Sequence, residues 1–472
     1  MTVPVPSASP PGGPAHRALR GASNLAALFG VQIANAALPL LAFPHLLNVA
    51  GHARYAEVVL AEALALAVLT LALYSFDINA VSRVVGLQER DDSAAISKAY
   101  SDVLWARMAI FLPAAALALL GCLAFAPALL HALAWWLLLP LSHIVQSAWM
   151  FQGLERNLPI AVATLLSRIG SIALILTLVD GSDAYLLVPA FIGSTALVGA
   201  FGLAAYVRWS LGIRLHRVSA NALRSLFVDG GSIFFGNCSV FMYRDMNVVL
   251  LGASGAGATA VAAYSMAEKL VKGIQAMARP LNQFFFPKAV RAIRHMTCAD
   301  RRALRTLAGL TWPQMAAVAA LVLGLCIGWL LGADRLPMLR DLPERDHIGM
   351  LVLAMTPAIF VGISNFTLGS VGLNHLGNRR FLFLALLTVG LLNLAVCSLL
   401  AFKWGSGGAA SALCSASCCW PSWWWGVTWC AESPARQARP ATGLRTATEP
   451  PWTCSTVRPA WPSLLQSWAW PW

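Results

Sequence analysis

The residues of this chain that are best suited to chemistry are ionisable side chains inside long apolar stretches. A charge at the centre of a membrane-crossing helix costs roughly 2.5–3.5 kcal/mol on insertion scales, so such a residue must face another charge, a ligand or water. Three acids and five bases are placed in this way: Glu62, Arg168, Arg244, Asp245, Glu268, Lys269, Lys272 and Arg279. Because bases outnumber acids, the surplus positive charge indicates an anionic ligand, such as a phosphate or a pyrophosphate.

The polar residues between positions 258 and 284 recur at intervals of three or four: Glu268, Lys272, Gln275, Arg279 and Asn282. This spacing predicts a polar stripe along one face of a helix. Shorter polar sets align in other stretches: Gln32 with Asn35, Thr164 with Arg168, and Asn237 with Arg244 and Asn247. An alternative is that the charges form buried ion pairs that only fix helix packing, such as Arg168 with Glu62, or Arg244 with Asp245 or Glu268.

Composition identifies the elements that must position these residues. The chain has 472 residues, of which 58% are hydrophobic and 11% charged, against roughly 25% charged in soluble domains. A membrane-crossing helix uses about 20 apolar residues, so we expect an all-α polytopic membrane protein with about 12 transmembrane helices. The net charge of +13 is typical of cytoplasmic loops in such a protein and does not indicate nucleic-acid binding.

Apolar runs predict eleven spans and a twelfth candidate at 408–430. The eleven are 24–48, 57–76, 102–125, 129–150, 158–179, 184–207, 231–252, 258–284, 307–331, 348–372 and 381–402. With the N-terminus in the cytoplasm, 18 basic residues fall inside and 4 in the outer loops up to the eleventh span, as the positive-inside rule requires. Asp102 and Arg107 lie near the cytoplasmic end of their span, where we expect their side chains to reach water.

The spans divide into two sets of six. We expect a disordered cytoplasmic tail at 1–23, an N-terminal lobe at 24–210 and a C-terminal lobe at 225–402. Each set begins with a span, a short turn (at Ala50-Gly51 in the first set) and a tyrosine followed by a glutamate. This pattern favours an internal repeat, with the substrate site at the interface of the repeats, although two unrelated helical hairpins would look similar.

Composition changes abruptly after Lys403. Residues 403–472 contain 11 of the 18 tryptophans and 5 of the 10 cysteines. We interpret this Trp- and Cys-rich tail as the product of a shifted reading frame, which DNA sequencing around codon 403 would test. An aromatic interface segment or a cysteine metal site are the alternatives, but the cysteine spacing matches no standard zinc pattern. We expect no disulfide framework and no metal site.

Three ordered motifs give the chain a family resemblance: residues 149–155 (WMFQGLE), 264–270 (YSMAEKL) and 280–287 (PLNQFFFP). In these, and over about residues 24–400, the sequence resembles the Wzx-type O-antigen and exopolysaccharide flippases of the MOP exporter superfamily. The resemblance implies two six-helix lobes around a central cavity, lined mainly by the first, second, seventh and eighth helices. It also implies movement of an undecaprenyl-pyrophosphate-linked oligosaccharide across the bacterial inner membrane by alternating access, using an ion gradient.

In the light of this resemblance, we expect the polar residues to have the following roles. We expect no cofactor. The residues expected to hold the pyrophosphate or line its cavity are Arg244, Lys272, Arg279 and Arg168. The residues expected to meet sugar hydroxyls are Asn35, Gln32, Gln275 and Asn237. The candidates for ion coupling are Glu62, Asp245 and Glu268. The expected partners are the lipid-linked oligosaccharide, membrane lipids, and a polymerase or other polysaccharide assembly proteins.

Three other functions share features with this pattern. A lipid II flippase carries a similar pyrophosphate lipid, so charge does not distinguish it. A MATE-type drug exporter mostly carries cations and would be expected to have an acidic cavity. A membrane-bound glycosyltransferase, ligase or polymerase needs catalytic carboxylates or a large outer loop, whereas the longest outer loop, 332–347, is a mixed-charge segment. We therefore expect a transporter and not an enzyme.

Overall fold

The computed structural model describes residues 14–88, 92–293, 301–332, 342–373 and 379–431, together with Arg90, Met296 and Arg340. Every regular element in these ranges is helical. Eight helical stretches within them are long and apolar enough to cross a membrane, and a ninth is formed if two helices joined at a bend are taken as one span. The chain is therefore an all-helical, polytopic membrane protein, as its composition predicts.

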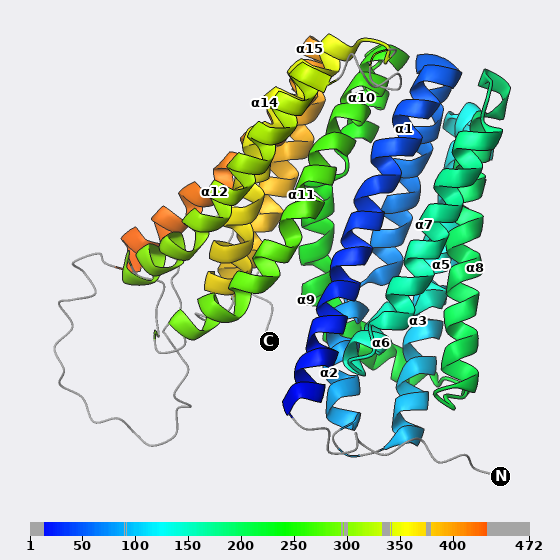
Figure 1. Cartoon of the computed structure of the whole chain (residues 1–472), viewed down its shortest axis with the longest axis vertical. Coiled ribbons are helices and arrows are strands. Elements are labelled where there is room, and N and C mark those ends of the chain that lie inside the picture. The colour runs from blue at the N-terminus through cyan, green and yellow to red at the C-terminus, as the bar shows by residue number, and fades with distance from the viewer. Residues whose placement is uncertain are drawn as a thin grey trace.

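The helices form two groups that meet along α1 and α11 (Figure 1). The first group contains α1 (Pro14–Leu73), α2 (Phe76–Gln88), α3 (Ser93–Phe125), η1 (Pro127–Leu129), α4 (Leu130–Trp136), α5 (Leu138–Gln146), α6 (Ala148–Gly153), α7 (Leu158–Leu178), η2 (Ser182–Leu186) and α8 (Leu187–Trp209). The later part of the chain forms α9 (Ala220–Arg244), α10 (Asn247–Ala253), α11 (Gly257–Ile293), α12 (Arg301–Gly332), α14 (Arg345–Asn365), the π-helical η4 (Phe366–Leu373) and α15 (Arg379–Ala431).

α1 consists of two antiparallel helices joined at Gly51. This glycine has φ 72° and ψ 175°, angles that other residues adopt only with strain. Across it, the rings of Phe43 and Tyr55 pack edge to face with centroids 6.2 Å apart, and Lys269 contacts both Phe43 and Glu62. Residues 43 and 62 would be about 28 Å apart in a straight helix. The chain therefore reverses at the turn expected at Ala50-Gly51.

α15 reverses in the same way at Gly405, where φ is 56° and ψ is −132°. After it, Ser406 Oγ lies 3.0 Å from His347 Nε2, and Cys414 Sγ donates to the Ala354 carbonyl. These contacts advance in the same direction along both helices, so the segment after Gly405 runs parallel to α14. The start of the compositionally unusual tail is thus helical and packed, while residues 432–472 lie outside the described ranges.

Two predicted boundaries are wrong. α1 begins at Pro14, inside the segment 1–23 that was expected to be a disordered tail; residues 1–13 lie outside the described part. The predicted span 231–252 is not one straight helix: α9 begins at Ala220, bends by 56° between 220–231 and 233–244, and is separated from α10 by a break. The glycines at 230 and 231 allow this bend.

Tyr74, at the junction between α1 and α2, contacts both parts of α9. The ring of Tyr74 stacks on Phe234 with centroids 4.3 Å apart and meets Phe227 edge to face at 5.5 Å. Its hydroxyl donates to the Phe227 carbonyl at 2.8 Å, and its carbonyl accepts from Asn237 Nδ2 at 3.0 Å. α9 therefore connects the two groups of helices.

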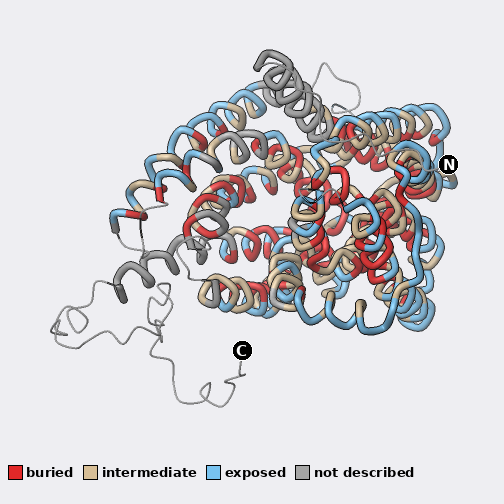
Figure 2. Tube along the Cα trace, turned by 90° about the horizontal axis from the view of Figure 1, so that it is seen from below, coloured by how far each residue is buried: buried red, intermediate tan, exposed pale blue. Residues whose placement is uncertain are grey.

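The outer surface of the helices is apolar. Large exposed hydrophobic side chains cover outward faces of four helices: Leu112, Leu117, Leu120, Leu123 and Phe125 on α3, Leu165, Leu166 and Ile169 on α7, Leu323 on α12, and Leu391, Leu399 and Phe402 on α15. Figure 2 shows buried residues on the inward sides of these helices and exposed residues around the outside. Because soluble proteins rarely expose apolar patches of this extent, these faces fit contact with lipid.

The number of spans differs from the expected eleven or twelve for identifiable reasons. The stretches that contain Gly51 and Gly405 each count once in the eight, although the chain reverses within both. α11 is 37 residues long and lies among the spans in Figure 1, yet it is not one of the eight because its polar stripe makes it too hydrophilic.

Candidate functional site

The first contact between buried charges joins α11 to both halves of α1. Lys269 forms an ion pair with Glu62, and its Nζ lies 3.7 Å from the centroid of the Phe43 ring. The alternative pairing of Glu62 with Arg168 is not the one observed. Lys269 therefore fixes α11 against the hairpin formed by α1.

A second group of charges, here named the Lys272 cluster, contains Arg244, Asp245, Glu268 and Lys272. Lys272 Nζ lies 2.8 Å from Asp245 Oδ1 and 3.3 Å from Glu268 Oε2. Arg244 Nε lies 3.2 Å from Asp245 Oδ2. Asp245 thus receives one cation from each side, as the end of α9 meets α11.

Local structure explains why these four residues meet. α9 ends at Arg244, and Asp245 occupies the break before α10, so its carboxylate is free to turn toward α11. Glu268 and Lys272 are four residues apart on α11 and share one face. Lys272 is 15 residues from the first residue of α11, or about 22 Å along the axis, which is near mid-membrane for a bilayer of about 40–45 Å including its headgroup regions.

The accessible part of the Lys272 cluster is cationic. The side chains of Arg244 and Lys272 are 45% and 30% exposed, whereas those of Asp245 and Glu268 are 15% and 7% exposed. Glu268 Oε1 is buried and has no hydrogen-bond partner among the described residues. The cations of the cluster are therefore accessible, whereas its carboxylates are shielded by protein. This arrangement can bind an anion.

The remaining predicted site residues are placed as follows. Arg168 on α7 faces α1, where its Nε donates to Asn35 Oδ1 at 3.2 Å. Gln275 Nε2 donates to the Ala358 carbonyl on α14 at 3.4 Å. Asn237 lies away from the Lys272 cluster and bonds to Tyr74. The side chains of Gln32 and Arg279 lie outside the described part of the structure.

The prediction that Asp102 and Arg107 reach water is wrong. Their exposed fractions are 2% and 1%. Arg107 Nη2 lies 2.6 Å from Asp77 Oδ1, and Arg83 Nη2 lies 3.9 Å from Asp102 Oδ2. The reason is that α2 packs over this end of α3 and covers it with protein. The opposite charges on α2 were the sequence signal that could have indicated this pairing.

Metal binding finds no support in the described ranges. Within them, no group of three or more histidine, cysteine, aspartate or glutamate side chains is placed to hold a metal ion. The chemistry that the described site residues offer is electrostatic, from the cations of the Lys272 cluster and the neighbouring amides.

The fold of this chain is similar to that of solved transporters of the MATE/MOP type. A solved structure described as an "Inward-facing conformation of a multidrug resistance MATE family transporter of the MOP superfamily" aligns with a TM-score of 0.61 at 13% identity, over 85% of this chain and 97% of that one. A MOP superfamily transporter from Pyrococcus furiosus, whose structure is described by a reversed polarity of its binding pocket, aligns with a TM-score of 0.54 at 12% identity, over 87% and 96% of the two chains.

The family is defined more narrowly by sequence. The profile of the family described as "Polysaccharide biosynthesis protein" matches residues 22–292, and the chain belongs to this family. It is 23% identical over 406 residues to the "Putative O-antigen transporter" of Escherichia coli (strain K12), covering 84% of this chain and 93% of that protein. A protein of Shigella dysenteriae with the same description is 24% identical over 281 residues, 56% of this chain and 66% of that protein.

Proposed function

We propose that this protein is a flippase of the bacterial inner membrane that moves undecaprenyl-pyrophosphate-linked oligosaccharide units from the cytoplasmic to the periplasmic leaflet. Its membership of the polysaccharide biosynthesis family and its similarity to proteins described as O-antigen transporters support a role as a transporter and not an enzyme. The MATE/MOP fold supports alternating access as the means of transport.

The observation that carries this proposal is that the accessible side chains of the Lys272 cluster are its two cations, Arg244 and Lys272. In our interpretation, the Arg244 guanidinium and the Lys272 ammonium bind the pyrophosphate, since arginine offers paired donors and lysine a compact charge. Arg279 lies two turns further along the polar stripe of α11 and would extend the site. Arg168, which bonds to a neutral amide, is a further cation for the same cavity.

Amide side chains near the cations would contact the oligosaccharide. Asn35 uses its amide oxygen and Gln275 its amide nitrogen in a contact within the protein. This leaves the amide nitrogen of Asn35 and the amide oxygen of Gln275 for sugar hydroxyls. Gln32 lies one turn before Asn35 on α1. Asn237 is the least favoured of the four, because its amide is already bonded to Tyr74 and lies apart from the cluster.

The proposed architecture consists of two lobes, residues 24–210 and 225–402, with the segment after Gly405 as a twelfth span and the cavity between α1, α9 and α11. Residues 261–268 of α11 are all buried, whereas exposure increases after residue 274. This gradient supports a state in which the periplasmic end of the lobe interface is closed and the cytoplasmic end is open. A substrate would then enter from the cytoplasmic leaflet.

Ion coupling follows from the same contacts. A bound pyrophosphate would compete with Asp245 and Glu268 for Lys272. Separation from Lys272 would leave the buried Glu268 carboxylate in need of another cation or a proton, because an uncompensated buried charge is strongly unfavourable. We therefore propose that Asp245 and Glu268, and by its ion pair Glu62, respond to the ion gradient that drives transport.

The decisive experiment replaces the two accessible cations. Lys272→Gln and Arg244→Gln should each reduce surface polysaccharide at least tenfold in cells that lack their own flippase, since one lost charge contact of about 1.4 kcal/mol is a tenfold loss of affinity. The matched control is Arg54→Gln, which removes a cation from the exposed pair with Glu57. Normal surface polysaccharide in both site variants, at equal membrane abundance, would contradict the proposal.

A second assay separates the cargoes. We expect expression of this protein to restore surface polysaccharide in cells without an O-antigen flippase and to fail to support growth of cells depleted of their lipid II flippase. The opposite pattern would reassign the cargo to lipid II. Resistance to cationic drugs, with neither form of rescue, would reassign the protein to drug export.

A further inference from the structure

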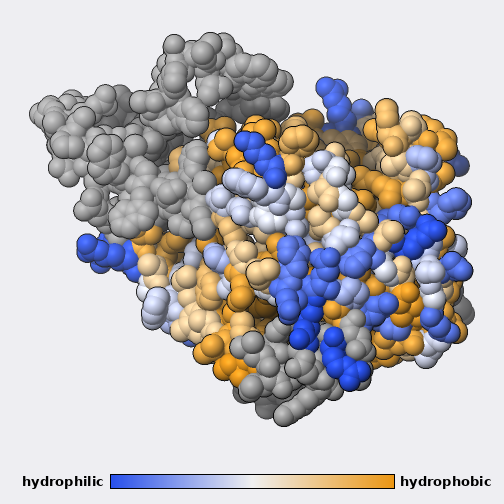
Figure 3. Space-filling model, turned by 90° about the horizontal axis from the view of Figure 1, so that it is seen from above, coloured by the Kyte–Doolittle hydropathy of each residue, from blue (hydrophilic) through white to orange (hydrophobic). Residues whose placement is uncertain are grey.

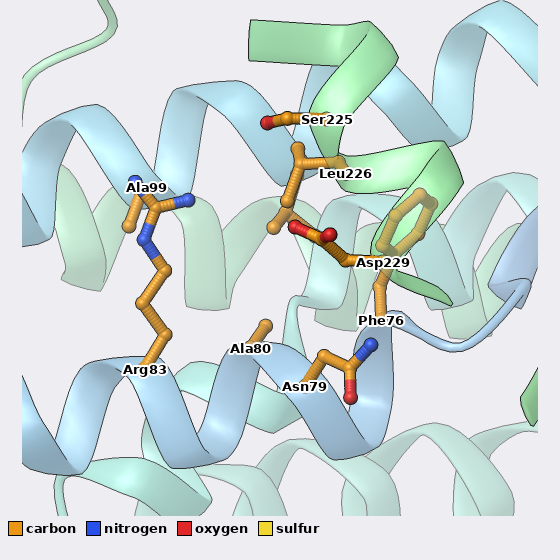
Figure 4. A pocket seen from close by; sticks show the side chains of 9 residues that line it. Phe76, Asn79, Ala80, Arg83, Ala99, Ser225, Leu226 and Asp229 are labelled. Atoms are coloured by element: carbon orange, nitrogen blue, oxygen red, sulfur yellow. The ribbon is translucent and has the colours of Figure 1, made fainter. Parts of the chain in front are cut away.

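A pocket separate from the Lys272 cluster lies where α2, α3 and α9 meet. Its volume is about 480 Å³, which is in the range of small-molecule sites. Its apolar lining comes from Phe76, Ala80, Val103 and Leu226. Figure 4 shows polar side chains around the same space, with Asn79 and Arg83 on α2 and Ser225 and Asp229 on α9.

The two charges of this pocket have opposite signs and come from different helices. Arg83 and Asp229 extend into the same space from α2 and α9 (Figure 4). Arg83 reaches a carboxylate only at 3.9 Å, that of Asp102, and Asp229 makes no ion pair within 4.0 Å among the described residues. The pocket therefore has a cationic wall at Arg83 and an anionic wall at Asp229, and neither charge is fully neutralised. Such a pocket suits a ligand that carries both a negative and a positive charge.

The pocket lies close to one end of the bundle. Arg83 is five residues from the last residue of α2, Ser225 five from the first residue of α9, and Ala99 six from the first residue of α3, so these residues lie within about 10 Å of their helix ends. This depth corresponds to the headgroup region of a bilayer. The loop before α9 contacts α3 here, since Ser101 Oγ accepts from the His216 backbone amide at 2.9 Å. The positive-inside rule places this end in the cytoplasm.

We propose that this pocket binds the headgroup of a zwitterionic phospholipid with a phosphoethanolamine headgroup. Arg83 binds the phosphate, assisted by Asn79 and Ser225, and Asp229 accepts hydrogen bonds from the primary ammonium. Phe76 and Leu226 contact the glycerol and the start of the acyl chains. Basic pockets on the cytoplasmic side of membrane proteins bind anionic lipids, but here the carboxylate of Asp229 would repel a purely anionic headgroup.

The test is lipid binding by the intact purified protein, measured by native mass spectrometry. The probes are phosphatidylethanolamine, phosphatidylglycerol and phosphatidylcholine with identical acyl chains. We expect phosphatidylethanolamine to bind about five- to tenfold more tightly than the other two, because phosphatidylglycerol lacks the ammonium and phosphatidylcholine cannot donate hydrogen bonds to Asp229. Asp229→Asn should remove this preference, and Arg83→Gln should weaken all three lipids.

Two further variants protect the test against misfolding and non-specific effects. Ser225→Trp adds bulk at an exposed position of the pocket wall and should abolish one lipid-binding event without removing a charge. Asp183→Asn is the control, since Asp183 is exposed at the other end of the molecule. An unchanged preference in Asp229→Asn, or retention of the bound lipid in Ser225→Trp, would overturn the proposal.

Discussion

At the residue scale, the buried charges fall into two kinds. Those of the Lys272 cluster keep accessible cations, which suits binding. Arg107 is fully buried against α2, with its Nη2 on Asp77 and its Nε without a hydrogen-bond partner among the described residues. Its position beside Phe76 and its lack of accessibility indicate that it stabilises the packing of α2 on α3.

Asp77→Asn tests this structural role. Removal of the carboxylate leaves the Arg107 guanidinium buried without its counter-charge, so we expect a loss of about 1–3 kcal/mol in stability. The measurement is the thermal unfolding midpoint of the purified protein in detergent, which should fall. Asp183→Asn, at an exposed site, should leave it unchanged, and equal midpoints for the two variants would show that the Asp77–Arg107 pair does not stabilise the fold.

The sequence predicted which faces the candidate site residues occupy but not their partners. Periodicity placed Glu268 and Lys272 on one face of α11, and the structure brings Asp245 to that face. Periodicity could not predict that Glu62 pairs with Lys269, which is 207 residues away, because helical spacing determines faces and not which helices become neighbours. Asn237 and Arg244 lie on the same straight part of α9, residues 233–244, yet the Asn237 amide bonds to Tyr74 while Arg244 pairs with Asp245.

At the element scale, the reversals at Gly51 and Gly405 define the helical hairpins. Both glycines have backbone angles in a region that is essentially restricted to glycine. Apolar runs predicted the turn at Gly51 and a twelfth candidate span at 408–430, which falls within the helix that follows Gly405. The fold depends there on small residues, Ala409, Ala410 and Ala412, which are buried.

Gly51→Ala should destabilise the protein by about 1–3 kcal/mol, because a Cβ at φ 72° is strained even though the added atom would meet no neighbour. Gly121→Ala is the matched control. Gly121 is also free of neighbours within 4 Å but lies inside α3 with a negative φ, so alanine should be neutral or stabilising by about 0.5–1 kcal/mol. Unfolding midpoints of both variants provide the comparison, and similar values would exclude strain at the hairpin.

At the scale of the whole molecule, the charged residues of the loops predict the orientation. The end that carries Gly51 and Arg54 has a polar central surface (Figure 3), and the opposite end carries the basic segment before α9. The positive-inside rule assigns the first end to the periplasm. The class of fold followed from composition, and the orientation is a prediction from the positions of the loop charges, whereas the number of spans required the two reversals and the charged helix α11.

Cysteine labelling tests this orientation. In a variant without the native cysteines, Ser182→Cys should react with a membrane-impermeant maleimide added to whole cells, because Ser182 is exposed at the end expected to face the periplasm. Ser219→Cys, at the start of α9, should react only after the cells are opened. The reverse pattern would invert the topology, and with it the side from which substrate enters.

The ion pair between Lys269 and Glu62 has a consequence for synthesis of the chain. Glu62 is translated long before Lys269, so the first hairpin enters the bilayer with its acid unpaired. α11 is too hydrophilic to partition into lipid from the translocon by itself. We therefore expect it to leave the translocon by docking on the α1 hairpin, so that the residues that join the two groups of helices in the mature protein also recruit the second group during biogenesis.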